Sequence, residues 1–186
     1  MPLTTAQLTT LKAAIDANPT WAAYPMSGDG HFDLAKALDA QANPAFWVWS
    51  TNVDIQAIKD AVVWANLTPA DVPDGTQAWA NRSLHCQGKQ FNLQLIIPTT
   101  GSYNAANVNT RGGLQDALTA VRSGAAGASQ SAGWATVQAV LARRATFAEQ
   151  ILANVAAGNG SSRQLSATMT QEGALQPDDV RLARGG

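Results

Sequence analysis

The stretch that decides the predicted fold is WATVQAVLARRATFAEQILANV, residues 134–155. Its apolar side chains recur at heptad-like spacing over about six turns, the period of one face of an α-helix. The members of this stripe are Trp134, Val137, Leu141, Ala145, Ala148, Leu152 and Val155. Residues 134–155 are therefore predicted to form one long helix near the C-terminal end of the chain.

Helical patterns also fill the part of the chain that precedes this stretch. Thr4 and Gln7 have the spacing of a capping box, and Leu8, Leu11 and Ile15 follow on one helix face. The same spacing, with capping and stop signals, predicts further helices. They cover residues 31–41, a segment capped by Asn52 that carries Ile55, Ile58, Val62 and Ala65, residues 76–97 and a short segment at 114–121. Residues 45–50 are predicted to be a short strand or a helical turn.

A segment rich in Gly and Ser, residues 158–162, ends the helical patterns. It divides the chain into a predicted helical body, residues 1–157, and a C-terminal extension, residues 158–186. The extension holds a β-prone stretch at 167–170 and a helical turn at 177–184. The predicted fold class is mainly α, a helical bundle with a long C-terminal helix and an extended, flexible C-terminal tail.

The composition is low in charge for a soluble protein. Charged residues make up 13% of the 186 residues and the formal net charge is −1, against a typical charged fraction of about 25%. Without net positive charge, a broad nucleic-acid-binding face is disfavoured. One Cys excludes an intrachain disulfide. The N-terminal stretch lacks the pattern of a secretory signal and no apolar run is long enough to span a membrane, so we expect a soluble protein.

Residue pairs that could carry catalysis or bind a metal are weak in this sequence. His85 and Cys86 are adjacent, and adjacent side chains on a helix point about 100° apart, so we expect Cys86 to be a core residue rather than part of a dyad. His31 lies between Asp29 and Asp33, where the start of a helix accounts for the carboxylates better than a metal site does. These residues predict no reactive centre.

Glu149 and Glu172 are the only glutamates, and each is isolated in the sequence. Arg111, Gly112 and Gly113 lack the lysine and the preceding strand of a phosphate-binding loop. We therefore expect no catalytic residue, no cofactor and no bound metal. The sequence favours a binding or structural protein over an enzyme.

Aromatic and arginine side chains are the positive signal for interactions. Six Trp are present and every basic residue after Lys89 is Arg. Trp and Arg contribute a large share of the energy at protein interfaces, although a Trp-rich core is the alternative interpretation of the aromatic residues. The candidate interface residues are Trp47, Trp49, Arg143, Arg144, Met169, Val180, Arg181 and Arg184.

Two segments of the chain carry distinctive patterns. Near the N-terminus they are LTTLKAAI at 8–15, DGxFxLA at 29–35 with Leu38, and NPAFWVWST at 43–51. Near the C-terminus they are LARRATxAE at 141–149, ATMTxEG at 167–173 and DVxxAR at 179–184. With these patterns, residues 3–65 and 133–184 resemble a family of small proteins encoded in the structural gene clusters of tailed bacteriophages.

Within such clusters, a mostly helical protein of this size with a flexible C-terminal tail resembles the head–tail adaptor, or head-completion connector, proteins. The resemblance implies a ring of copies, commonly twelve, bound beneath the portal protein and joining the capsid to tail or stopper proteins. It also implies a place in the neck of the virion after synthesis in the host cytoplasm, non-specific contact with packaged DNA in the channel, and no membrane.

Two alternatives to an adaptor remain open at this point. One is another virion component, namely a stopper, a tail-completion protein or a capsid-decorating protein. The other is a virion-associated cell-wall lysin, which would need Glu149 or Glu172 as a carboxylate with a raised pKa.

Overall fold

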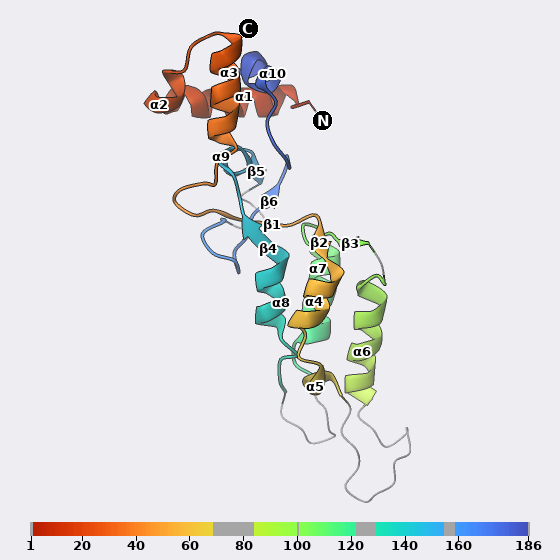
Figure 1. Cartoon of the computed structure of the whole chain (residues 1–186). Helices are drawn as coiled ribbons and strands as arrows, with labels where there is room; N and C mark the ends of the chain where they lie inside the picture. The colour runs from red at the N-terminus through yellow and green to blue at the C-terminus, as the bar shows by residue number, and fades with distance from the viewer. Residues whose placement is uncertain (1, 69–83, 100, 122–128, 155–158, 186) are drawn as a thin grey trace, which may run out of the picture. The chain divides into compact units, whose positions relative to one another are not determined.

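The computed structural model describes residues 2–68, 84–99, 101–121, 129–154 and 159–185 (Figure 1). Ten helices and six short strands lie in these residues, about half of which are helical, with the strands in small two-stranded sheets. The fold is therefore mainly α, as predicted. No helix in the described part of the chain is long and apolar enough to cross a membrane.

The chain forms two compact units. The terminal unit joins the two ends of the chain, Met1–Trp49 and Arg143–Gly186, and the central unit is Ser50–Ala142. The sequence predicts a boundary at residue 158, whereas the structure groups residues on both sides of that position with the N-terminal helices.

Helices from both ends of the chain build the core of the terminal unit. The capping box predicted at Thr4 and Gln7 is confirmed, and Leu11 and Ile15 are buried. Ser27 caps the next long helix by accepting a hydrogen bond from the Gly30 N–H, so that helix begins three residues earlier than predicted. The helices are α1 (Thr5–Ala17), α2 (Pro19–Ala22), α3 (Gly28–Leu38), α9 (Phe147–Ile151) and α10 (Pro177–Ala183). Helix α10 packs against α1 and α3 (Figure 1).

Short strands complete the terminal unit. The segment predicted as a strand or a helical turn is a strand, β1 (Trp47–Trp49), which pairs with β4 (Ala142–Arg144). On its other side, the Trp49 N–H donates to the Ala167 carbonyl at 3.0 Å and the Ala167 N–H donates to the Trp47 carbonyl at 2.9 Å. The remaining pair, β5 (Ala153–Asn154) and β6 (Thr168–Met169), is antiparallel.

The single long helix predicted for residues 134–155 is wrong. The chain forms α8 (Trp134–Leu141), then β4, then α9, then β5. Strand β1 recruits the backbone of β4 as its partner, and Thr146 starts a new helix through a capping box with Glu149. The apolar stripe is nevertheless largely buried, including Val137, Leu141, Ala145, Ala148 and Leu152.

The predicted flexible tail is also wrong for the described residues 159–185. Val180 is fully buried, and Leu175 and Ala183 lie in the same core as the N-terminal helices. The buried carboxylate of Asp179 accepts hydrogen bonds from the backbone N–H groups of Gln176 and Leu3. A few apolar side chains on a short helix hold this segment in the core, because α10 packs against both α1 and α3.

A glycine fixes the segment that the sequence analysis treats as a break. Gly160 has φ +68°, a left-handed conformation that favours glycine, and a Cβ there would lie 2.2 Å from the Phe46 ring. Its carbonyl accepts a hydrogen bond from the Trp47 N–H at 2.8 Å. Gly160 is therefore a packing position rather than part of a linker.

The central unit packs helices α4, α5, α6, α7 and α8 with one strand pair. Asp54, rather than Asn52, caps α4, which ends at Ala61 because the Val63 N–H donates to the Ala132 carbonyl at 3.0 Å. The elements are β2 (Val53–Asp54), α4 (Ile55–Ala61), α5 (Trp64–Leu67), α6 (Leu84–Ile96), β3 (Ser102–Tyr103) and α7 (Val108–Leu118). Helix α6 is the described part of the helix predicted for residues 76–97, whose first residues, with Trp79, lie outside the described residues.

Candidate functional site

The two tryptophans of β1 have different environments. Trp49 is 4% exposed and belongs to the buried residues of the terminal unit. Trp47 is half-buried, and the guanidinium carbon of Arg163 lies 4.5 Å from the centre of its ring, a cation–π contact. Trp49 therefore serves the core, while Trp47 is covered on one face by Arg163 of the same chain.

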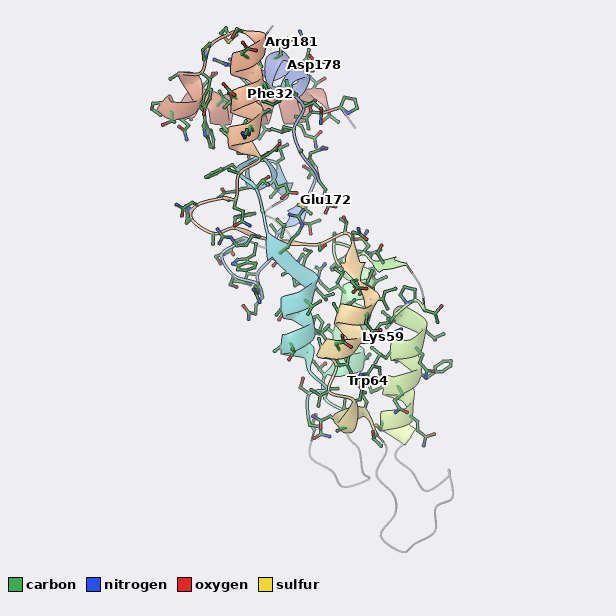
Figure 2. The ribbon with its side chains drawn as sticks, in the orientation of Figure 1. Phe32, Lys59, Trp64, Glu172, Asp178 and Arg181 are labelled. Atoms are coloured by element: carbon green, nitrogen blue, oxygen red, sulfur yellow. The ribbon has the colours of Figure 1, made fainter. Side chains whose placement is uncertain are left out.

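Arg143 is the centre of an ion-pair cluster that the sequence analysis missed. Its guanidinium donates two hydrogen bonds to Glu149, at 2.8 Å to Oε2 and 2.6 Å to Oε1, a bidentate geometry. The same group donates to Glu172 Oε1 at 3.2 Å and approaches Met169 Sδ at 3.3 Å. The two isolated glutamates are thus brought together on one arginine, and Glu172 is labelled in Figure 2.

The Glu149 carboxylate is held in its ionised form. It is 3% exposed, and burial by itself raises its pKa. Hydrogen bonds from Arg143 and from the Thr146 backbone, with the positive charge of Arg143, outweigh burial and leave the pKa below its ordinary value of 4.5. Glu149 is therefore an ionised structural carboxylate, which is the opposite of a general acid.

Two further candidate arginines bind backbone carbonyls of the terminal unit. Arg144 donates to the Ala42 carbonyl at 2.8 Å. Arg184, at the end of α10, donates to the Tyr24 carbonyl at 2.8 Å and to the carbonyls of Ala22 and Pro25 at 3.4 and 3.3 Å. Arg184 thereby ties the C-terminal helix to the end of α2.

The other candidates divide between core and surface. Val180 is buried and Met169 packs beside Arg143. Arg181 lies on the solvent side of α10, where its side chain is 43% exposed and pairs with Asp178 at 3.2 Å (Figure 2). The structure brings Arg143 and Met169 together and uses most of the candidates inside the terminal unit. Their contact with another molecule stays a prediction.

Cys86 and His31, the residues considered for catalysis or metal binding, are both buried. Cys86 is buried, as expected for a core residue; its Sγ donates to the Leu67 carbonyl at 2.6 Å, and burial raises the pKa of the thiol. His31 is 6% exposed on the inner face of α3, whereas Asp29 and Asp33 are exposed on the outer face. In the described part of the chain, no three His, Cys, Asp or Glu residues lie close enough to hold a metal ion.

A groove in the central unit is the feature that sequence reasoning did not find. It has a volume of about 520 Å³ and lies between α4–α5 and α6. Its lining includes Lys59, Trp64, Gln90, Leu93, Gln94 and Ile97. Trp64 is 50% exposed although its indole N–H donates to the Lys59 carbonyl at 2.9 Å. The available signal was that Trp64 falls between Val62 and Ala65 of the predicted apolar stripe, and so off the buried face.

Lys59 is the one charged side chain among the described residues that line the groove. It is half-buried, and none of the ion pairs in the described residues involves it. An apolar floor with a single unpaired cation at its rim fits an apolar group that carries a carboxylate nearby.

Comparison with known proteins gives no relative for this chain, because no family model, no curated protein and no solved structure matches it.

Proposed function

We propose that this protein is a structural component of a tailed-phage virion, a head–tail adaptor that forms a ring under the portal and joins the capsid to the tail. The observation that carries the proposal concerns the two segments that resemble the phage family, residues 3–65 and 133–184. Most of both segments belongs to one compact unit, residues 1–49 with 143–186. Patterns distant in the sequence thus correspond to one folded body.

The described surface supports a role in assembly. Large apolar side chains are well exposed on several helices, including Phe32, Phe91, Leu95 and Val108, each more than half exposed. Few charges accompany them, since only 13% of the residues are charged. Exposed apolar groups on a weakly charged surface favour contacts with other protein copies.

The adaptor's partners are further copies of this chain, the portal protein, and tail or stopper proteins, with non-specific contact to packaged DNA in the channel. It acts in the virion neck after synthesis in the host cytoplasm and needs no cofactor. Helix α10 is packed into the folded body of each subunit. Contacts with the portal are therefore made by preformed surfaces rather than by a tail that orders on binding.

A lysin is the less favoured alternative. Such an enzyme needs a protonated carboxyl near neutral pH, and Glu149 is instead an ionised carboxylate bound to Arg143. Glu172 also contacts Arg143, at 3.2 Å. These contacts support a non-enzymatic role for the only two glutamates of the chain.

Electron microscopy of the purified protein mixed with the portal protein of the same virus tests the proposal. The expected result is a ring of extra density on the tail-facing end of the portal, absent from the portal alone. Binding to tail tubes or to capsids instead would replace the adaptor by another virion component. A portal that gains no density would refute the adaptor.

A further inference from the structure

The outer face of α3 presents an aromatic side chain between carboxylates. Asp29, Phe32, Asp33 and Lys36 are exposed, and the last three lie three, four and seven residues after Asp29, so the four share one helix face. The inner face of the same helix is buried through His31, Leu34, Ala35 and Leu38. Phe32 is 58% exposed, two residues before the fully buried Leu34 of the same helix (Figure 2).

The carboxylates on this face are uncommitted. None of the ion pairs in the described residues involves Asp29 or Asp33. Lys36 lies one turn beyond Phe32 and leaves the face with one net negative charge. The face therefore presents an exposed Phe32 flanked by two carboxylates that form no ion pair within the described part of the chain.

The groove of the central unit has the complementary properties. The groove is lined by the buried Leu93 and Ile97 and by the half-exposed Trp64, and its Lys59 pairs with no carboxylate among the described residues. Gln90 and Gln94 line the α6 side and can bond to polar groups, including an amine such as that of Lys36. Figure 2 labels Phe32 on α3, Lys59 on α4 and Trp64 on α5.

We propose that the α3 face of one copy docks in the groove of a second copy of this chain, with Phe32 against Trp64 and Leu93 and with Asp29 or Asp33 paired with Lys59. Aromatic side chains in well-packed pockets are the usual energetic centre of an interface, and complementary charges set its specificity and register. Charge complementarity selects this occupant, because the α3 face carries the carboxylates of Asp29 and Asp33 and the groove carries the cation of Lys59.

The contact joins two different surfaces, so it can repeat from one copy to the next as a heterologous contact. When each copy offers its α3 face to one neighbour and its groove to another, such contacts give a ring if the rotation closes. The closure into a ring rests on the proposed adaptor function. The docking contact adds to that proposal the two surfaces through which copies meet. Association through these surfaces is a separate property from binding to the portal.

Variants at the exposed Asp29, Phe32 and Asp33 and at the half-buried Lys59 test the contact. Sedimentation velocity over a concentration series gives the association constant of the wild-type chain and of Phe32→Ala, Lys59→Asp and the double variant Asp29→Lys/Asp33→Lys. The control is Leu165→Ala, because Leu165 is 51% exposed and lies neither on α3 nor in the groove lining. Thermal melts check that every variant folds.

The expected result is self-association of the wild-type chain, weakened at least about tenfold by each of the three variants and changed less than about twofold by the control. Mixing Lys59→Asp with Asp29→Lys/Asp33→Lys should restore association between the two chains, because the unaltered α3 face of the Lys59→Asp chain then meets the unaltered groove of the Asp29→Lys/Asp33→Lys chain. A wild-type chain that stays monomeric, or variants that associate as well as the wild type, would overturn the inference.

Disulfide capture gives a direct readout of the same contact. Asp33→Cys and Lys59→Cys chains, mixed under mild oxidation, should form a cross-linked dimer, while Asp16→Cys on α1 mixed with Lys59→Cys should not. If the Asp33→Cys and Lys59→Cys chains do not cross-link, that result counts against the contact. If copies associate through these surfaces but add no density to the portal, the docking contact stands and the adaptor role fails. If density appears on the portal and the variants do not weaken association, the adaptor role stands and the docking contact fails.

Discussion

Replacement of Arg143 by Met tests the ion-pair cluster of the terminal unit. The substitution keeps an apolar stem and removes the guanidinium, which leaves the 3%-exposed Glu149 carboxylate without its bidentate partner. Breaking a buried pair in this way costs about 3–5 kcal/mol. The Arg143 side chain is 34% exposed, and solvent lowers the cost, so we expect a loss of about 2–3 kcal/mol in the free energy of unfolding.

Urea unfolding at pH 7, followed by circular dichroism, measures this loss. The control is Lys12→Met, which removes the exposed pair with Asp16 on α1, where both side chains are more than half exposed. That variant should lose less than about 0.5 kcal/mol. An Arg143→Met protein as stable as the Lys12→Met protein would refute the structural role assigned to the cluster.

The cluster also predicts a pH dependence. The pKa of Glu149 is lowered in the folded protein, so its contribution to stability is present above the ordinary value of 4.5 and is lost as the pH falls through the folded-state pKa. Glu149→Gln should be less stable than the wild type at pH 7, and the difference should shrink below about pH 4.5 as the wild-type carboxylate takes up a proton. A difference that grows on acidification would contradict this assignment.

Three further predictions concern segments that hold the fold together. Gly160→Ala should lower the free energy of unfolding by about 2–4 kcal/mol in urea melts, because its φ of +68° and the nearby Phe46 ring both oppose a Cβ; an unchanged midpoint would exclude this packing. Removal of residues 174–186 takes Leu175 and Val180 from the core, so the truncated chain should lose its cooperative thermal transition in the terminal unit, and retention of a wild-type melt would restore the view of this segment as a dispensable tail. Thr146→Ala removes a helix cap and should cost about 1 kcal/mol, whereas no measurable change would show that α9 does not depend on it.

Local signals in the sequence identified much of the helical structure. The capping box at Thr4 and Gln7, the buried face of α1 and the core position of Cys86 all follow from residues within a few positions of each other. Such contacts depend on the chain's own periodicity and on nearest neighbours. They are the part of the fold that a single sequence specifies most directly.

The break in the long apolar stripe shows where periodicity stops being informative. Leu141, Ala145 and Ala148 are buried both in a continuous helix and in the observed helix–strand–helix arrangement, so their spacing cannot distinguish the two. The deciding signal was the Thr146-to-Glu149 spacing, a second capping box inside the stripe. Pairing with β1, about a hundred residues earlier, then selects the extended conformation for β4.

The candidate sites depend on longer-range contacts still. Arg143, Glu149 and Glu172 meet because β4, α9 and the segment after β6 converge, and Glu172 is 29 residues from Arg143 in the sequence. The groove combines Lys59 and Trp64 with side chains of α6 some thirty residues further on. Sequence reasoning could name these side chains individually, but only the fold shows which of them share a site.

The central claim, that copies of this chain assemble into a ring on a portal, is tested most directly by native mass spectrometry of the portal with and without the purified protein. If the copies form a ring, the portal complex gains mass in a single step, by an integer multiple of the 19.4 kDa chain that equals a full ring. A portal whose mass does not change at saturating protein would show that no ring forms on it.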